Sequence, residues 1–122
     1  MNRVYTIVLS AFLMLILDAI YLNFSKNIFA DMVVSIQRVV MKVKILPAIL
    51  CYLLLIFGLN YFILNQKRSV LDAFLLGFII YGVFDTTNMA IFKKYKWNVG
   101  LMDALWGGIL FALVTSIVYA LD

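Results

Sequence analysis

The sequence predicts an all-α polytopic membrane protein, with four transmembrane helices in an antiparallel bundle and one interfacial amphipathic helix. Of its 122 residues, 66% are hydrophobic and 13% are charged, whereas a soluble domain has about 45–50% apolar and 25% charged residues. Apolar runs cover residues 4–24, 45–64, 70–92 and 99–121. Each can cross a hydrocarbon core of about 30 Å as a helix, and none alternates like a barrel strand. We expect one integral membrane domain over residues 1–122.

The first apolar run is too long for the core of a typical signal peptide, so we expect a retained helix. The segment that follows it, 27–44, has a helical period of its own. Its apolar face consists of Phe29, Met32, Val33, Ile36, Val40 and Val43, and its polar face of Asn27, Asp31, Arg38 and Lys42. This pattern predicts a helix that lies in the membrane interface with its basic face toward anionic headgroups. An amphipathic helix packed on the end of the bundle is the alternative.

The second and third runs have local signals at their ends. Pro47 stands in the first turn of the second run, where its missing N–H has no intrahelical partner. The short link 65–69 requires an antiparallel neighbour. Ser69 and Asp72 have the spacing of a capping box, with Asp in place of the usual Glu. Asp72 is therefore explained by its position at a helix N-terminus.

Small residues recur every four positions along the fourth run, at Gly100, Ala104, Gly108, Ala112 and Ser116. Such residues allow helix backbones to approach closely inside a membrane. The row drifts around an ideal helix, so it would contact one neighbour obliquely or two in succession. We expect it to be a helix-packing ridge, either within the bundle or between copies in a homo-oligomer.

The charged residues are ten Lys and Arg against six Asp, without His, for a net charge of +4. Because the basic residues lie between apolar runs, we expect them to contact lipid headgroups and not nucleic acid. One side holds Lys26, Arg38, Lys42, Lys44, Lys93, Lys94 and Lys96; the other holds Arg3, Lys67 and Arg68. This imbalance predicts cytoplasmic basic loops and both termini on the opposite side. One cysteine and no histidine predict neither a metal site nor a cofactor.

Three aspartates interrupt the apolar runs at similar depth. Asp18, Asp85 and Asp103 would lie about 6–10 Å below the face that holds the basic loops, at 1.5 Å per residue. An acid inside a membrane is expensive and usually faces a partner or a cavity. We therefore predict that the three converge in one polar site, where neighbouring like charges favour retention of a proton or binding of a cation.

Further polar and aromatic residues share the faces of these acids. Tyr81, Asp85 and Asn88 follow one stripe of the third run, Trp106 shares a stripe with Asp103, and Tyr21 lies one turn beyond Asp18. We expect Asn88 to orient a carboxyl group and the aromatic rings to wall the site, with Tyr52 at comparable depth. The alternative is structural: each acid would simply hydrogen-bond to a neighbouring donor.

Three motifs together resemble the DUF2177 family of small predicted membrane proteins. The segment from Tyr81 to Ala90 matches Y-x-x-Y/F-D-x-T-N-x-A, Trp97 follows, and residues 103–107 match D-x-x-W-G. Residues 17–22 match L-D-A-x-W/Y-L in the first helix. The resemblance implies a four-helix membrane protein without an established activity, in a bacterial cytoplasmic membrane or an internal or virion membrane of a large DNA virus.

Two functions are consistent with these residues. The first is binding or translocation of a proton, cation or small molecule at the aspartates. The alternative is a structural or assembly protein of a cellular or viral membrane, in which the interfacial helix and the small-residue ridge are important. No nucleophile–base pair or metal-ligand set stands out, so we assign no catalytic residue and do not expect an enzyme.

Overall fold

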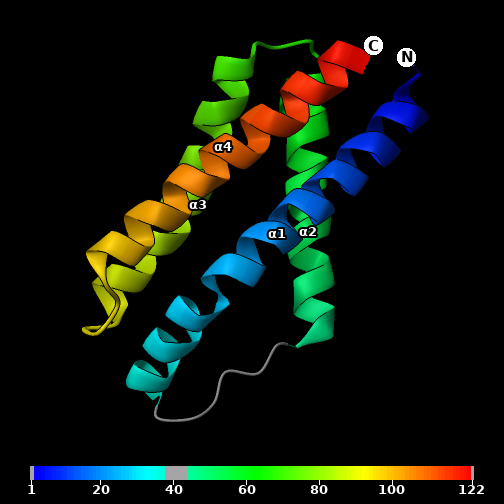
Figure 1. The fold of residues 1–122 in the computed structure, drawn as a ribbon. Helices are drawn as coiled ribbons and strands as arrows, with labels where there is room; N and C mark the ends of the chain where they lie inside the picture. Colours follow the sequence, from blue (N-terminus) through cyan, green and yellow to red (C-terminus); the bar gives the residue numbers. More distant parts are fainter. Residues whose placement is uncertain (1, 38–43, 122) are drawn as a thin grey trace.

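The computed structural model describes residues 2–37 and 44–121, all in helices and short links, which confirms the predicted all-α class. The elements are α1 (Arg3–Gln37), α2 (Ile45–Leu59), the π-helical turn η1 (Asn60–Leu64), α3 (Val70–Ile91) and α4 (Trp97–Leu121). Four helices are long and apolar enough to cross a membrane, with η1 continuing α2. The two termini lie at the same end of the bundle (Figure 1), as an even number of crossings requires.

The first helix is longer than predicted. The expected end near Phe24 is wrong, because α1 continues without a break to Gln37. No Gly or Pro interrupts this extension, and the Ser25 hydroxyl donates to the Tyr21 carbonyl oxygen one turn earlier, at 2.9 Å. The predicted interfacial helix therefore begins as part of α1, and residues 38–43 lie outside the described residues. Its position along a membrane surface stays a prediction.

A widened turn ends the second helix. The Asn65 amide donates to the Asn60 carbonyl oxygen, five residues back, at 2.8 Å. The Asn60 amide group donates to the Ser10 hydroxyl of α1 at 3.0 Å and to the Ile56 carbonyl oxygen at 2.9 Å. Asn60 and Ser10 are both buried. This pair is thus a polar tie between α1 and the end of α2.

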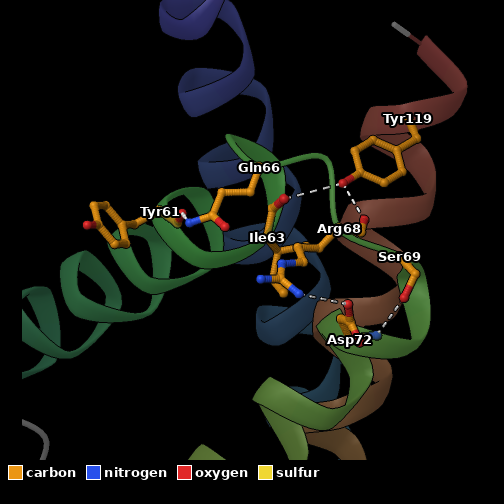
Figure 2. A network of polar contacts seen from close by, with 7 residues as sticks. All are labelled: Tyr61, Ile63, Gln66, Arg68, Ser69, Asp72 and Tyr119. Carbon is orange, nitrogen blue, oxygen red and sulfur yellow. Dashed lines mark hydrogen bonds and ion pairs between the residues drawn. The ribbon is translucent and has the colours of Figure 1, made fainter.

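The link from η1 to α3 is fastened to the end of α4 (Figure 2). Tyr119 Oη lies 2.6 Å from the Arg68 carbonyl oxygen and 3.4 Å from that of Ile63, so its proton goes mainly to Arg68. Ser69 Oγ accepts the Asp72 amide at 3.1 Å, so the predicted N-terminal cap is present. Lys67, with φ of 53°, has the left-handed backbone that reverses the chain here.

Helix α4 occupies the centre of the arrangement. It lies alongside α3 and also contacts α1, which crosses α2 (Figure 1). The apolar core is formed where these helices meet, around Met14, Leu59, Leu110, Phe111 and Val114. In the most apolar stretch of α4, 44% of the residues are buried, whereas in the corresponding stretches of the other three spans 17% are buried. Most apolar side chains of those three therefore face the surroundings, as expected for helices in lipid.

The ridge of small residues is only partly used inside the bundle. Gly100, Ala104 and Gly108 are buried, Ala112 is half-buried and Ser116 is exposed, so the row turns away from the bundle along α4. The closest backbone approach involves glycines that the ridge did not include. A Cβ atom on Gly77 would lie 2.2 Å from the carbonyl oxygen of Gly107, so α3 and α4 touch backbone to backbone there.

Candidate functional site

All three intramembrane aspartates are buried between helices. The exposed fractions of Asp18, Asp85 and Asp103 are 6%, 0% and 8%. Each accepts at least one hydrogen bond from an aromatic side chain. Isolated burial of an ionised carboxyl group is very unfavourable, and such donors offset part of that energy. The aromatic residues are thus the immediate polar partners of the acids.

Asp18 joins three helices. One carboxyl oxygen accepts the hydroxyl proton of Tyr52 from α2. The other accepts the indole N–H of Trp106 from α4, at 2.9 Å. Both oxygens of Asp18 therefore have a donor, and the contacts hold α1 against α2 and α4 at the depth of this residue.

Asp103 is connected to this group through stacked rings. Tyr21 Oη of α1 donates to Asp103 Oδ1 at 3.3 Å. The Tyr21 ring stacks on Trp106, with ring centroids 4.7 Å apart and an interplanar angle of 2°. Since Trp106 donates to Asp18, the two acids share one aromatic pair. The structure therefore brings Asp18, Tyr21, Asp103 and Trp106 together.

Asp85 is held from the link between α3 and α4. Tyr95 Oη, outside the apolar helices, donates to Asp85 Oδ1 at 2.6 Å. Burial, followed by this hydrogen bond, raises the pKa of Tyr95 above its ordinary value, so the phenol keeps its proton and remains a donor. Asn88 is half-buried on α3, and its expected role in orienting a carboxyl group stays a prediction.

Asp85 and Asp103 form a pair of carboxyl groups. Asp85 faces α4 within one turn of Asp103, since a Cβ atom on Gly100 would lie 3.5 Å from the Cβ atom of Asp85. Among the described residues, Asp85 Oδ2 is buried and receives no hydrogen bond from an ordinary donor. A bond between two carboxyl groups requires a proton on one of them. The pair is therefore suited to sharing one proton.

The other site residues predicted from sequence have different positions. Tyr81 packs its ring over Gly107, where an added Cβ would lie 2.3 Å from the ring. Tyr52 and Tyr95 are hydrogen-bond donors that the predicted site set lacked. The aromatic type of Tyr52 and its position in an apolar run could have indicated it as a donor. Tyr95 stands in a basic link, where nothing in the sequence indicates a contact with an acid. Within residues 2–37 and 44–121, no three potential metal ligands come together.

The Tyr21 contacts can be separated by substitution. Tyr21→Phe removes the hydrogen bond to Asp103 and keeps the stack on Trp106, so we expect a loss of about 0.5–1.5 kcal/mol in unfolding free energy. Tyr21→Leu also removes the stack and should lower the unfolding free energy by about a further 0.5–1.5 kcal/mol. Denaturant titration in detergent measures both, with exposed Tyr5→Phe in the same helix as the control. Equal values for the two Tyr21 variants would contradict a role for stacking.

Apolar helices around buried acids define a multi-pass helical membrane protein with a hydrogen-bonded intramembrane carboxyl cluster. Residues 3–120 match the family described as predicted membrane protein DUF2177, and the chain belongs to this family. This confirms the resemblance seen in the motifs around Asp18, Asp85 and Asp103. No curated protein matches the chain, and no solved structure matches it.

Proposed function

We propose that this membrane protein binds a proton at the Asp85–Asp103 pair and passes it through the bundle. The observation that carries the proposal is the burial of two carboxyl groups on facing turns of α3 and α4, one of which has an oxygen without an ordinary donor. A shared proton satisfies that oxygen and removes one of two unfavourable charges from the membrane. Loss and recovery of this proton is the simplest chemistry available to the pair.

Side chains that donate hydrogen bonds to the acids lie on both sides of the pair, and a proton would need a bridging water to pass the stacked rings of Tyr21 and Trp106. Tyr95 connects Asp85 to the link between α3 and α4, next to Lys93, Lys94 and Lys96. Tyr21 hydrogen-bonds to Asp103 and stacks on Trp106, which in turn donates to Asp18. Tyr52 completes the series on α2. We propose that the basic link faces the cytoplasm and that protons enter there.

A proton fits these contacts better than a metal ion. Phenol and indole groups donate hydrogen bonds, and both oxygens of Asp18 already accept one. Hard cations such as Ca²⁺ take six to eight oxygen ligands, which the two remaining carboxyl groups are too few to provide.

Proton flux into liposomes that contain the purified protein and a pH-sensitive dye tests the proposal. An imposed pH gradient should dissipate faster than in empty liposomes, and Asp85→Asn or Asp103→Asn should bring the rate back to that of empty liposomes. Asp31→Asn, an exposed acid on α1, is the matched control and should keep the flux. Wild-type flux equal to that of empty liposomes would contradict the proposal.

A structural or assembly role is the second candidate, and the contacts of Asp18 favour it. This acid ties α1 to α2 and α4 through two hydrogen bonds, which is what an acid retained only for packing would do. In that case Asp85→Asn and Asp103→Asn would change folded yield or assembly, without any flux to lose. The same liposome experiment therefore separates the two functions.

A further inference from the structure

A groove of about 330 Å³ lies between α3 and α4, next to the carboxyl pair. Its walls are apolar and include Phe78, Val83, Met89, Trp97 and Leu101. Val83, Trp97 and Leu101 are exposed, so the groove opens on the face that would contact lipid. Its volume is in the range of small-molecule sites, about 300–1,000 Å³.

The polar groups of the groove are few, and one lacks a donor. The Thr86 hydroxyl, which lines the groove, donates to the Gly82 carbonyl oxygen at 2.7 Å. Asp85 also lines the groove, is fully buried, and has an oxygen, Oδ2, that receives no hydrogen bond from an ordinary donor in the described chain. An apolar channel beside an unsatisfied acid acceptor is suited to a ligand with a hydrocarbon body and a donor at one end.

We propose that this groove binds a lipophilic primary amine, with the hydrocarbon chain along the apolar walls and the ammonium group donating to Asp85. The inference rests on the proposed function in one respect: a carboxyl pair that shares one proton keeps one negative charge. Each carboxylate oxygen has two acceptor sites, so Asp85 Oδ2 can accept the shared proton and an ammonium proton together. An ammonium group offsets that charge as well as donating a hydrogen bond to the carboxylate, whereas an alcohol donates a hydrogen bond but leaves the charge uncompensated. None of the lining residues is itself a cation.

Two glycines supply a matched pair of variants. A Cβ atom on Gly82 would meet only the Ala104 methyl group, at 4.0 Å, and Gly82 lines the groove. A Cβ atom on Gly58, in α2, would meet nothing within 4 Å. Gly82→Leu therefore places an isobutyl group in the groove from a position where the Cβ itself meets no close contact, and Gly58→Leu adds the same side chain elsewhere.

The experiment measures quenching of tryptophan fluorescence in nanodiscs by a bromine-terminated dodecylamine, with the corresponding dodecanol as the neutral probe. We expect saturable quenching by the amine, about tenfold weaker binding of the alcohol, and loss of the quenching in Trp97→Phe. Gly82→Leu should abolish binding, Gly58→Leu should preserve it, and Asp85→Asn should make the two probes equivalent.

Equal binding of amine and alcohol by the wild-type protein, or quenching unchanged in Gly82→Leu, would overturn the inference and indicate ordinary lipid contact. The two proposals fail separately. Gly82→Leu leaves both carboxyl groups in place, so its proton flux should persist while amine binding is lost. Saturable amine binding by a protein without proton flux would leave the groove assigned and contradict only the translocation proposal.

Discussion

Replacement of Gly77 by alanine is expected to give the largest loss of stability of any single methyl group added to this protein. The new Cβ would lie 2.2 Å from the carbonyl oxygen of Gly107 and 2.8 Å from its carbonyl carbon. Those atoms belong to the α4 backbone and cannot rotate away as a side chain can. The helices must separate, and we expect about 3 kcal/mol of destabilisation, the upper part of the range for overpacking.

Unfolding of the purified variant in detergent, followed by circular dichroism in a denaturant titration, measures this effect. Gly58→Ala is the control, since its Cβ enters open space and alanine favours a helix. Gly108→Ala should be intermediate, because its nearest atoms belong to the Phe74 ring, at 2.8 Å, and that ring can move. Should Gly77→Ala be as stable as Gly58→Ala, the backbone contact between α3 and α4 would be disproved. If Gly77→Ala gives no folded protein, its folded yield against Gly58→Ala supplies the comparison.

Asp18→Ala is expected to produce the second large effect. It leaves the Tyr52 hydroxyl and the Trp106 indole N–H without their acceptor. Interhelical hydrogen bonds in membranes contribute about 1–2 kcal/mol each in model peptides, so we expect the loss of about 2–4 kcal/mol. Asp18→Asn keeps one acceptor oxygen and should lose about half of this.

The control for Asp18 is Asp31→Ala, because Asp31 is exposed on the same helix. Thermal unfolding in detergent compares the three variants under one condition. A tie between helices predicts the order Asp18→Ala, Asp18→Asn, Asp31→Ala, from least to most stable. An Asp18→Ala variant as stable as wild type would show that the carboxyl group does not hold the helices together.

Part of the site could be predicted because the position of a residue along its own helix depends only on the local sequence. The positions of Asp18, Asp85 and Asp103 within apolar runs follow from counting residues along a helix. Their meeting also depends on how each helix is rotated about its axis, which contacts between helices determine. Tyr21 and Trp106 do meet Asp103 and Asp18, whereas Tyr81 turns toward Gly107 and serves as packing.

Other features were beyond sequence reasoning for a physical reason. Tyr95 reaches Asp85 from the link between α3 and α4, and link conformation has no periodic signature. The extension of α1 to Gln37 was misjudged because the polar residues after Phe24 suggested a helix end. A continuous helix satisfies its own backbone, and the Ser25 hydroxyl bonds within it.

The sequence by itself determined the membrane class, the four apolar spans, the family and the positions of three acids within those spans, because hydropathy and helical rise depend only on the order of residues. Tertiary structure alone decided which donor each acid receives, the contact of Gly77 with Gly107, and the groove beside Asp85. These depend on the angle and rotation at which helices pack. Lipid gives little preference for one apolar face over another, so small residues and buried polar contacts determine that packing.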